Sequence, residues 1–299
     1  MAFEEGRLAL PDGDVAYLRR AGRAGAGTVL FAHANGLNAG AYLPMLEALG
    51  GPESVLALDL RGHGRTTLPA EPEALTRWDL YGEDLGRVVR ALAPEGPLVL
   101  AGHSLGAVAV LLAAAAGLAA ERVVLIEPVV VPRLARLVAR GPLRGPLIRR
   151  RGIAGRAARR RDGWPDEASA RARYAEAAFF AGWHEGALDG YLARGLRPDG
   201  DGDGDGAGVR LACAPAWEAA SFAAQGHAFW RPLGQVAARL PVHVLKARGT
   251  GSTVPEHAVT RLVRAGALTT QAEGSHMLPT ERPAAVAAYL ALVLSGASV

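Results

Sequence analysis

The chain has 299 residues, of which 50% are hydrophobic and 21% are charged, and its formal net charge is +4. This size allows a large buried core, and the lone Cys213 excludes an internal disulfide. The longest nearly uncharged run, 98–120, is interrupted too often by Gly, His and Ser to predict a membrane span. Because the N-terminus has no basic segment followed by an apolar one, we expect a cytoplasmic protein without a membrane span.

Short apolar runs alternate with helical patterns along most of the chain. The first two runs, "GRLAL" and "DVAYLRR", flank Pro11-Asp12-Gly13 and predict a β-hairpin. Further strands are expected at 28–33, 54–60, 97–101, 122–126, 241–247 and 268–272, and helices at 42–50, 76–93, 104–119, 255–264 and 281–294. Apolar strands that alternate with helices indicate an α/β fold with a doubly wound, mostly parallel sheet.

The alternation stops between residues 128 and 235. This block has a helical composition, and the chain returns to the sheet at Pro241. We therefore expect a core of residues 1–127 and 236–299, with residues 128–235 as a mostly helical insertion after the sixth strand. Five aromatic residues of the insertion could either roof an apolar pocket or form the insertion's own core: Trp164, Tyr174, Phe179, Phe180 and Trp183.

Two features of this block raise the question of a ligand. Arginines are concentrated between Arg133 and Arg173, which could form a nucleic-acid or membrane-surface patch or, as we favour, a solvated helical face. Residues 199–208, "DGDGDGDGAG", match the start of a calcium loop, but the twelfth position is Ala212 and not the Glu that such a loop needs. We therefore expect a polar turn there, no nucleic-acid partner and no bound metal.

A serine stands between two glycines where a predicted strand becomes a predicted helix. The segment Gly102-His103-Ser104-Leu105-Gly106 has the spacing G-x-S-x-G. A turn this sharp strains the serine backbone, and glycines beside it avoid collisions with neighbouring elements. The serine also lies at a helix N-terminus, whose free amides favour developing negative charge. We therefore predict that Ser104 is a nucleophile and not an incidental turn residue.

Together with three other segments, this motif resembles the α/β-hydrolase superfamily over nearly the whole chain. "FAHANG" (31–36) is similar to its oxyanion loop, "DLRGHGRT" (59–66) to the segment after its fourth strand, and "AEGSHMLPTERP" (272–283) to the loop with its catalytic histidine. The resemblance implies the α/β-hydrolase fold, with residues 128–235 as a cap domain over the active site. It disfavours haloalkane dehalogenase and epoxide hydrolase activity, because those members have Asp at the nucleophile position.

The resemblance also implies a base and an acid, in the chain order Ser, acid, His. His276 follows the last strand at the family position, and we assign it as general base. The family most often has its acid after the strand 241–247, where this chain has "RGTGSTVPE" and no Asp. Three alternatives stay open. They are Glu127 after the sixth strand, which we favour because some members have Glu there; Glu256, which we expect to close a capping box with Thr253; and no acid at all.

The same resemblance implies an oxyanion hole formed by the amides of Leu105 and Asn35, with Gly36 allowing close approach. Asn35 could instead be a left-handed turn residue. These residues predict a serine hydrolase that cleaves small, fairly apolar carboxylic esters through an acyl-enzyme, without a cofactor. Two alternatives stay open. One is related acyl chemistry (thioesterase, acyltransferase or C–C bond hydrolase), and the other is a hydrolase-like ligand-binding protein without turnover.

Overall fold

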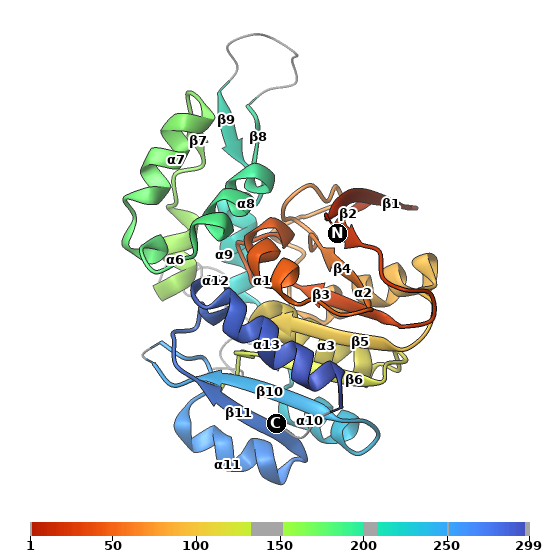
Figure 1. The fold of residues 1–299 in the computed structure, drawn as a ribbon. Helices are drawn as coiled ribbons and strands as arrows, with labels where there is room; N and C mark the ends of the chain where they lie inside the picture. The colour runs from red at the N-terminus through yellow and green to blue at the C-terminus, as the bar shows by residue number, and fades with distance from the viewer. Residues whose placement is uncertain (1, 133–151, 200–207, 250, 297–299) are drawn as a thin grey trace.

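The computed structural model describes residues 2–132, 152–199, 208–249 and 251–296. An eight-stranded sheet with the order β1-β2-β4-β3-β5-β6-β10-β11 forms its centre (Figure 1). β1 and β2 form the predicted hairpin, β2 also pairs antiparallel with β4, and the other neighbours pair parallel. The prediction of a mostly parallel sheet is confirmed. Its strands are β1 Glu4–Leu10, β2 Gly13–Arg20, β3 Thr28–Ala32, β4 Ser54–Leu58, β5 Leu98–His103, β6 Arg122–Ile126, β10 Val242–Ala247 and β11 Ala267–Ala272.

Helices cover both faces of this sheet (Figure 1). One face packs against α1 (Leu43–Ala48) and α13 (Pro283–Leu294). The other packs against α2 (Asp79–Leu92), α3 (Leu105–Ala115), α10 (Trp230–Ala237) and α11 (Glu256–Arg264). Because both faces are covered, the central strands are mostly apolar, and β5 and β10 are buried at every residue, including His103 in β5 and His243 and Lys246 in β10. The carboxyl ends of all the parallel strands meet at one edge of the sheet, where ligands of such folds bind.

Residues 152–229 add no strand to the large sheet in the part of the chain that the structure describes. They form helices and a separate sheet with the order β7-β9-β8, which the sequence did not predict because each strand has only two or three residues. The boundary expected at residue 236 falls inside α10, whose Leu233 and Val236 are buried in the core. The elements of the block are α6 Gly152–Ala158, β7 Gly163–Trp164, α7 Glu167–Ala175, η2 Ala178–Phe180, α8 Glu185–Gly195, β8 Leu196–Pro198, β9 Val209–Leu211 and α9 Pro215–Ala223.

The aromatic residues of this block form a buried cluster. Tyr174 has its ring centroid 5.0 Å from that of Phe180 and 5.6 Å from that of Tyr191 in α8. Trp164 and Trp183 are also buried in this cluster, whereas Phe179 is 58% exposed. Four of the five aromatic residues therefore form the block's own core, which was one of the two alternatives.

A buried ion pair holds α8 against the large sheet. Arg194 donates from Nη2 to Oδ2 of Asp59 at 2.7 Å, and both side chains are at most 4% exposed. Asp59, which follows β4, also accepts the amide N–H groups of Ala39 and Arg65 at 2.9 Å each. Ala39 begins the 3-10 helix η1 (Ala39–Tyr42), so this carboxylate joins the insertion to the loop that follows β3.

Two predicted features lie partly outside the described residues. The basic region 133–173 is described only from residue 152, and the calcium-like loop 199–208 only at its two ends. Within the ranges given above, no group of three or more His, Cys, Asp or Glu side chains is placed to hold a metal ion. None of the described helices is long and apolar enough to cross a membrane.

Candidate active site

Ser104 lies in the turn between β5 and α3, with φ 55° and ψ −113°. A Cβ atom on Gly106 would lie 2.1 Å from the carbonyl oxygen of Ala32 in β3, and one on Gly102 would lie 2.4 Å from the Gly106 carbonyl. The two glycines therefore let the turn pass directly beside β3, as the G-x-S-x-G spacing predicts. Strain at a serine in this position is typical of a nucleophile held at a strand–helix turn.

The structure brings Ser104, His276 and Glu127 together at the carboxyl edge of the sheet. The Oγ atom of Ser104 lies 3.0 Å from Nε2 of His276, which is in the loop after β11. The Nδ1 atom of the same ring lies 3.1 Å from Oε2 of Glu127. In this arrangement Nδ1 carries a proton that it donates to the carboxylate, and Nε2 is free to accept the serine proton.

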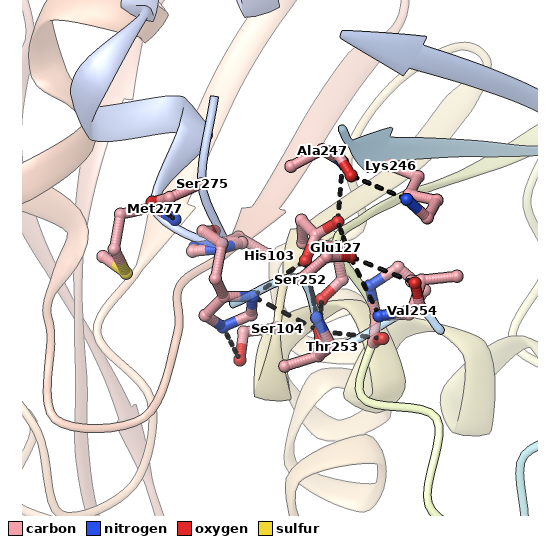
Figure 2. A network of polar contacts seen from close by, with 12 residues as sticks. His103, Ser104, Glu127, Lys246, Ala247, Ser252, Thr253, Val254, Ser275 and Met277 are labelled. Atoms are coloured by element: carbon pink, nitrogen blue, oxygen red, sulfur yellow. Dashed lines mark hydrogen bonds and ion pairs between the residues drawn. The ribbon is translucent and has the colours of Figure 1, made fainter. Parts of the chain in front are cut away.

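Glu127 follows β6 with a φ of 46°, and its side chain is completely buried. Its carboxylate accepts the amide of Ala247 at 2.7 Å, the hydroxyl of Ser252 at 2.8 Å and the amide of Thr253 at 2.9 Å (Figure 2). Burial alone would raise the pKa of Glu127, but the hydrogen bonds from His276, Ala247 and Thr253 outweigh it and hold that pKa below its ordinary value. The carboxylate is therefore charged at neutral pH.

Ser252 and Thr253 were not predicted as part of the site. They lie in the loop after β10, where the family most often has its Asp, and both donate to the Glu127 carboxylate. Ser252 donates through its hydroxyl, so a serine in an acid-free loop at this position was the signal that the sequence offered, whereas Thr253 donates through its backbone amide, which leaves no signal in the sequence.

Glu256 has a different role from the one expected. The helix α11 has Pro255 as its N-cap without a side-chain capping bond, so the predicted capping box with Thr253 is wrong. The Thr253 hydroxyl donates instead to the carbonyl oxygen of Glu127 at 2.9 Å, which removes it from the helix end. Glu256 pairs with the buried Nζ of Lys246 at 2.5 Å. The carboxylate that contacts His276 is that of Glu127.

The two expected oxyanion donors have free amide groups. Leu105 is the first residue of α3, and Asn35 lies in the loop after β3. Within the described residues neither backbone N–H has a hydrogen-bond partner, whereas that of Ala34 donates to the Tyr42 hydroxyl at 3.0 Å and that of Gly36 to Nε2 of His63 at 3.0 Å. The left-handed residue of this turn is Gly36, with φ 76°, and not Asn35. The amide of Asn35 thus has no protein partner within the described residues, as the predicted role of oxyanion donor requires.

Two other buried histidines fix the oxyanion loop. His33 donates from Nδ1 to the carbonyl oxygen of Ala34 at 2.7 Å, and Nε2 accepts the amide of Leu60 at 2.9 Å. His63 donates from Nδ1 to the carbonyl oxygen of Arg61 at 2.9 Å, so its Nε2 is the acceptor for Gly36. Burial lowers the pKa of His33 to about 4 and that of His63 to about 3. Both are therefore neutral structural groups and not catalytic bases.

A family model and a curated sequence match this chain. The model of the alpha/beta hydrolase family matches residues 29–289. A 2-(acetamidomethylene)succinate hydrolase of Mesorhizobium japonicum is 36% identical over 79 residues, which are 26% of this chain and 27% of that protein. The aligned segment thus spans about a quarter of this curated relative.

Solved structures match over nearly the whole chain. The crystal structure of E-2-(acetamidomethylene)succinate hydrolase superposes with a TM-score of 0.76 at 20% identity, covering 99% of this chain and 100% of that one. The thioesterase domain from the curacin biosynthetic pathway has a TM-score of 0.74 at 18% identity, with 98% and 100% covered. At these identities the likeness shows the fold alone.

Proposed function

Because the chain belongs to the alpha/beta hydrolase family, we propose that it is a serine hydrolase that cleaves small, fairly apolar carboxylic esters through an acyl-enzyme intermediate. A hydrolase follows from the family, and the ester substrate is our proposal. The observation that supports it most is the continuous series of contacts from Ser104 through His276 to Glu127, at 3.0 and 3.1 Å.

In the proposed reaction, Oγ of Ser104 attacks the ester carbonyl carbon while Nε2 of His276 takes the serine proton. The amides of Leu105 and Asn35 donate to the oxyanion, each worth about 2.7–4 kcal/mol of transition-state stabilisation in comparable enzymes. His276 then protonates the leaving alcohol as the C–O bond breaks. A water molecule then attacks the acyl carbon while the same ring takes its proton. His276 returns that proton to Oγ of Ser104 as the bond between Oγ and the acyl carbon breaks and the carboxylic acid leaves. Throughout, the Glu127 carboxylate orients and stabilises the imidazolium.

The main alternative is a hydrolase-like binding protein without turnover. It was motivated by the missing Asp after β10. The buried, charged Glu127 weighs against it, because a carboxylate beside Nδ1 supplies what the missing Asp would supply. An oriented base next to the serine has no use in simple ligand binding.

The test is labelling with a fluorophosphonate probe, followed by turnover of p-nitrophenyl esters of increasing acyl length. We expect labelling and turnover in the native protein and loss of both in Ser104→Ala. Ser275→Ala is the matched control. Ser275 precedes His276 in the chain, but its hydroxyl donates to Glu281 and is not placed to attack a substrate. Native protein that is folded and not labelled would instead support the binding-protein alternative.

The substrate panel also separates ester cleavage from related chemistry. The name of the curated relative motivates the inclusion of 2-(acetamidomethylene)succinate, and an acyl thioester covers the thioesterase alternative. We expect the highest kcat/KM for a short apolar ester. If kcat/KM for the thioester or for the succinate derivative is at least tenfold higher than for every ester, the ester assignment is wrong. The proposed nucleophile and base would be unaffected by that result.

A further inference from the structure

A series of buried hydrogen bonds joins the segments that carry the proposed catalytic groups. His103, which directly precedes the nucleophile, has Nε2 2.8 Å from the carbonyl oxygen of His276. Its Nδ1 atom lies 2.7 Å from the hydroxyl of Tyr42. That hydroxyl lies 3.0 Å from the amide nitrogen of Ala34, which precedes Asn35. The series therefore runs from the base loop, past the nucleophile turn, to the oxyanion loop.

Both ends of the series are backbone groups, and this fixes the direction of every bond. The carbonyl of His276 can only accept, so Nε2 of His103 carries the ring proton and Nδ1 is an acceptor. The Tyr42 hydroxyl must then donate to Nδ1, and its oxygen accepts the amide proton of Ala34. All members are satisfied when His103 is neutral. Burial agrees with this, since it lowers the pKa of His103 well below its ordinary value.

Neither side chain of the series has access to water. His103 and Tyr42 are both 0% exposed, and their rings meet edge to face with centroids 5.8 Å apart. If one of these side chains loses its hydrogen-bonding group, water cannot replace it inside the protein. The amide of Ala34 and the carbonyl of His276 would then have to move to find new hydrogen-bond partners. The two loops are therefore expected to shift together when either side chain is changed.

We propose that His103 and Tyr42 are positioning residues that hold the His276 loop and the oxyanion loop in register with Ser104. Neither side chain touches reacting atoms in the proposed reaction. Both act through the backbone, His103 on residue 276 and Tyr42 on residue 34. The inference rests on the proposed hydrolytic function, and its test is arranged so that the two can fail separately.

The test compares Tyr42→Phe, His103→Phe and the double variant with the native protein, using the best p-nitrophenyl ester of the panel. Tyr289→Phe is the matched control, since Tyr289 is a buried tyrosine on α13 that is only 6% exposed. His103→Gln is the rescue variant, because its amide offers both a donor and an acceptor. The readouts are kcat, KM, the melting temperature and the inhibition constant of phenylboronic acid, a tetrahedral mimic of the transition state.

We expect kcat to fall about 10- to 100-fold in Tyr42→Phe and in His103→Phe, with KM changed less than about threefold. Phenylboronic acid should bind more weakly by a similar factor. The double variant should lose little more than the worse single variant, because both break one series. Tyr289→Phe should keep native kcat, and His103→Gln should recover most of the loss.

Three results would overturn the proposal. One is native kcat in a folded Tyr42→Phe, one is a fall in melting temperature with unchanged kcat and boronate binding, and one is multiplicative losses in the double variant. If His103→Phe does not fold, Tyr42→Phe decides the matter by the same readouts. A native protein that neither labels nor turns over would overturn the proposed function as well, whereas altered variants of an active protein speak only to His103 and Tyr42.

Discussion

Thr253 holds Glu127 from two sides: its amide donates to Oε2 of the carboxylate at 2.9 Å, and its hydroxyl donates to the backbone carbonyl oxygen of the same residue at 2.9 Å. The hydroxyl also lies 3.3 Å from Nδ1 of His276. The loop after β10 therefore supplies donors to an acid that comes from β6. The acid follows β6, its hydrogen-bond donors follow β10 and the histidine follows β11. These three strands are neighbours in the sheet, with β10 in the middle.

The first prediction concerns the charge of that acid. In Glu127→Gln the side chain keeps its shape, but an amide cannot stabilise the imidazolium and can turn its NH₂ toward Nδ1–H. We expect kcat to fall by about 10³–10⁴-fold, as with comparable acid-to-amide changes. Glu256→Gln is the control, because the Glu256 side chain is 74% exposed and pairs with Lys246, and it should keep kcat within about twofold. The reverse ranking in steady-state kinetics would reassign the acid.

The second prediction is a loss of stability in mild acid. The unfolded chain protonates His33, His63 and His103 near pH 6.5, whereas burial keeps the folded pKa of His33 at about 4 and of His63 at about 3. Their contribution is complete above pH 6.5 and is lost as the pH falls from there toward the folded pKa values. Each histidine adds a slope of up to about 1.4 kcal/mol per pH unit.

Urea unfolding between pH 5 and pH 7.5 measures this slope. His63→Asn should reduce the pH slope of the unfolding free energy by the share of one proton, up to about 1.4 kcal/mol per pH unit. His257→Asn, which changes an exposed histidine on α11, should leave the slope as in the native protein. A free energy of unfolding that stays constant from pH 7 to pH 5 would show that these three histidines accept protons in the folded state.

The order of strands and helices in the core was predictable from the sequence. Strands covered on both faces are mostly apolar, as in β5, and helices such as α2 show spacing near three and four. Ser104 was also predictable, because only glycine fits at position 106 beside β3. Local patterns thus carried both the fold and the nucleophile turn.

The acid and its supports depended on contacts between distant segments. Glu127 contacts His276 across the end of β10, which lies between the strands that precede these two residues, and the φ of Glu127 is 46°. Neither the strand order nor this φ is visible in a local sequence pattern. The capping box failed for a similar reason, since the Thr253 hydroxyl contacts Glu127, 126 positions away. Tyr42 gave no signal at all, because its partner His103 is 61 positions away.

The third prediction tests the ion pair between α8 and the core. Arg194→Met leaves the Asp59 carboxylate buried without its cation, and we expect the free energy of unfolding to fall by about 3–5 kcal/mol. Arg171→Met is the control, because Arg171 pairs with Asp189 on the surface and its side chain is 52% exposed. That variant should stay within about 1 kcal/mol of the native protein in urea unfolding. Equal effects of the two substitutions would mean that the buried pair adds nothing beyond a surface pair.

The fourth prediction uses two glycines in helices that meet different surroundings. In Gly106→Ala the new Cβ atom would lie 2.1 Å from a backbone oxygen of β3, so the turn at Ser104 must move. We expect the free energy of unfolding to fall by about 1–3 kcal/mol or more, and we expect fluorophosphonate labelling to be lost as well. Gly234 in α10 has nothing within 4 Å of the corresponding Cβ position. Gly234→Ala should therefore stabilise the protein by about 0.4–1 kcal/mol, since alanine reduces the freedom of the unfolded chain without meeting a neighbour. A labelled and stable Gly106→Ala variant would contradict the close passage of this turn beside β3, and with it the geometric reason for glycine at this position.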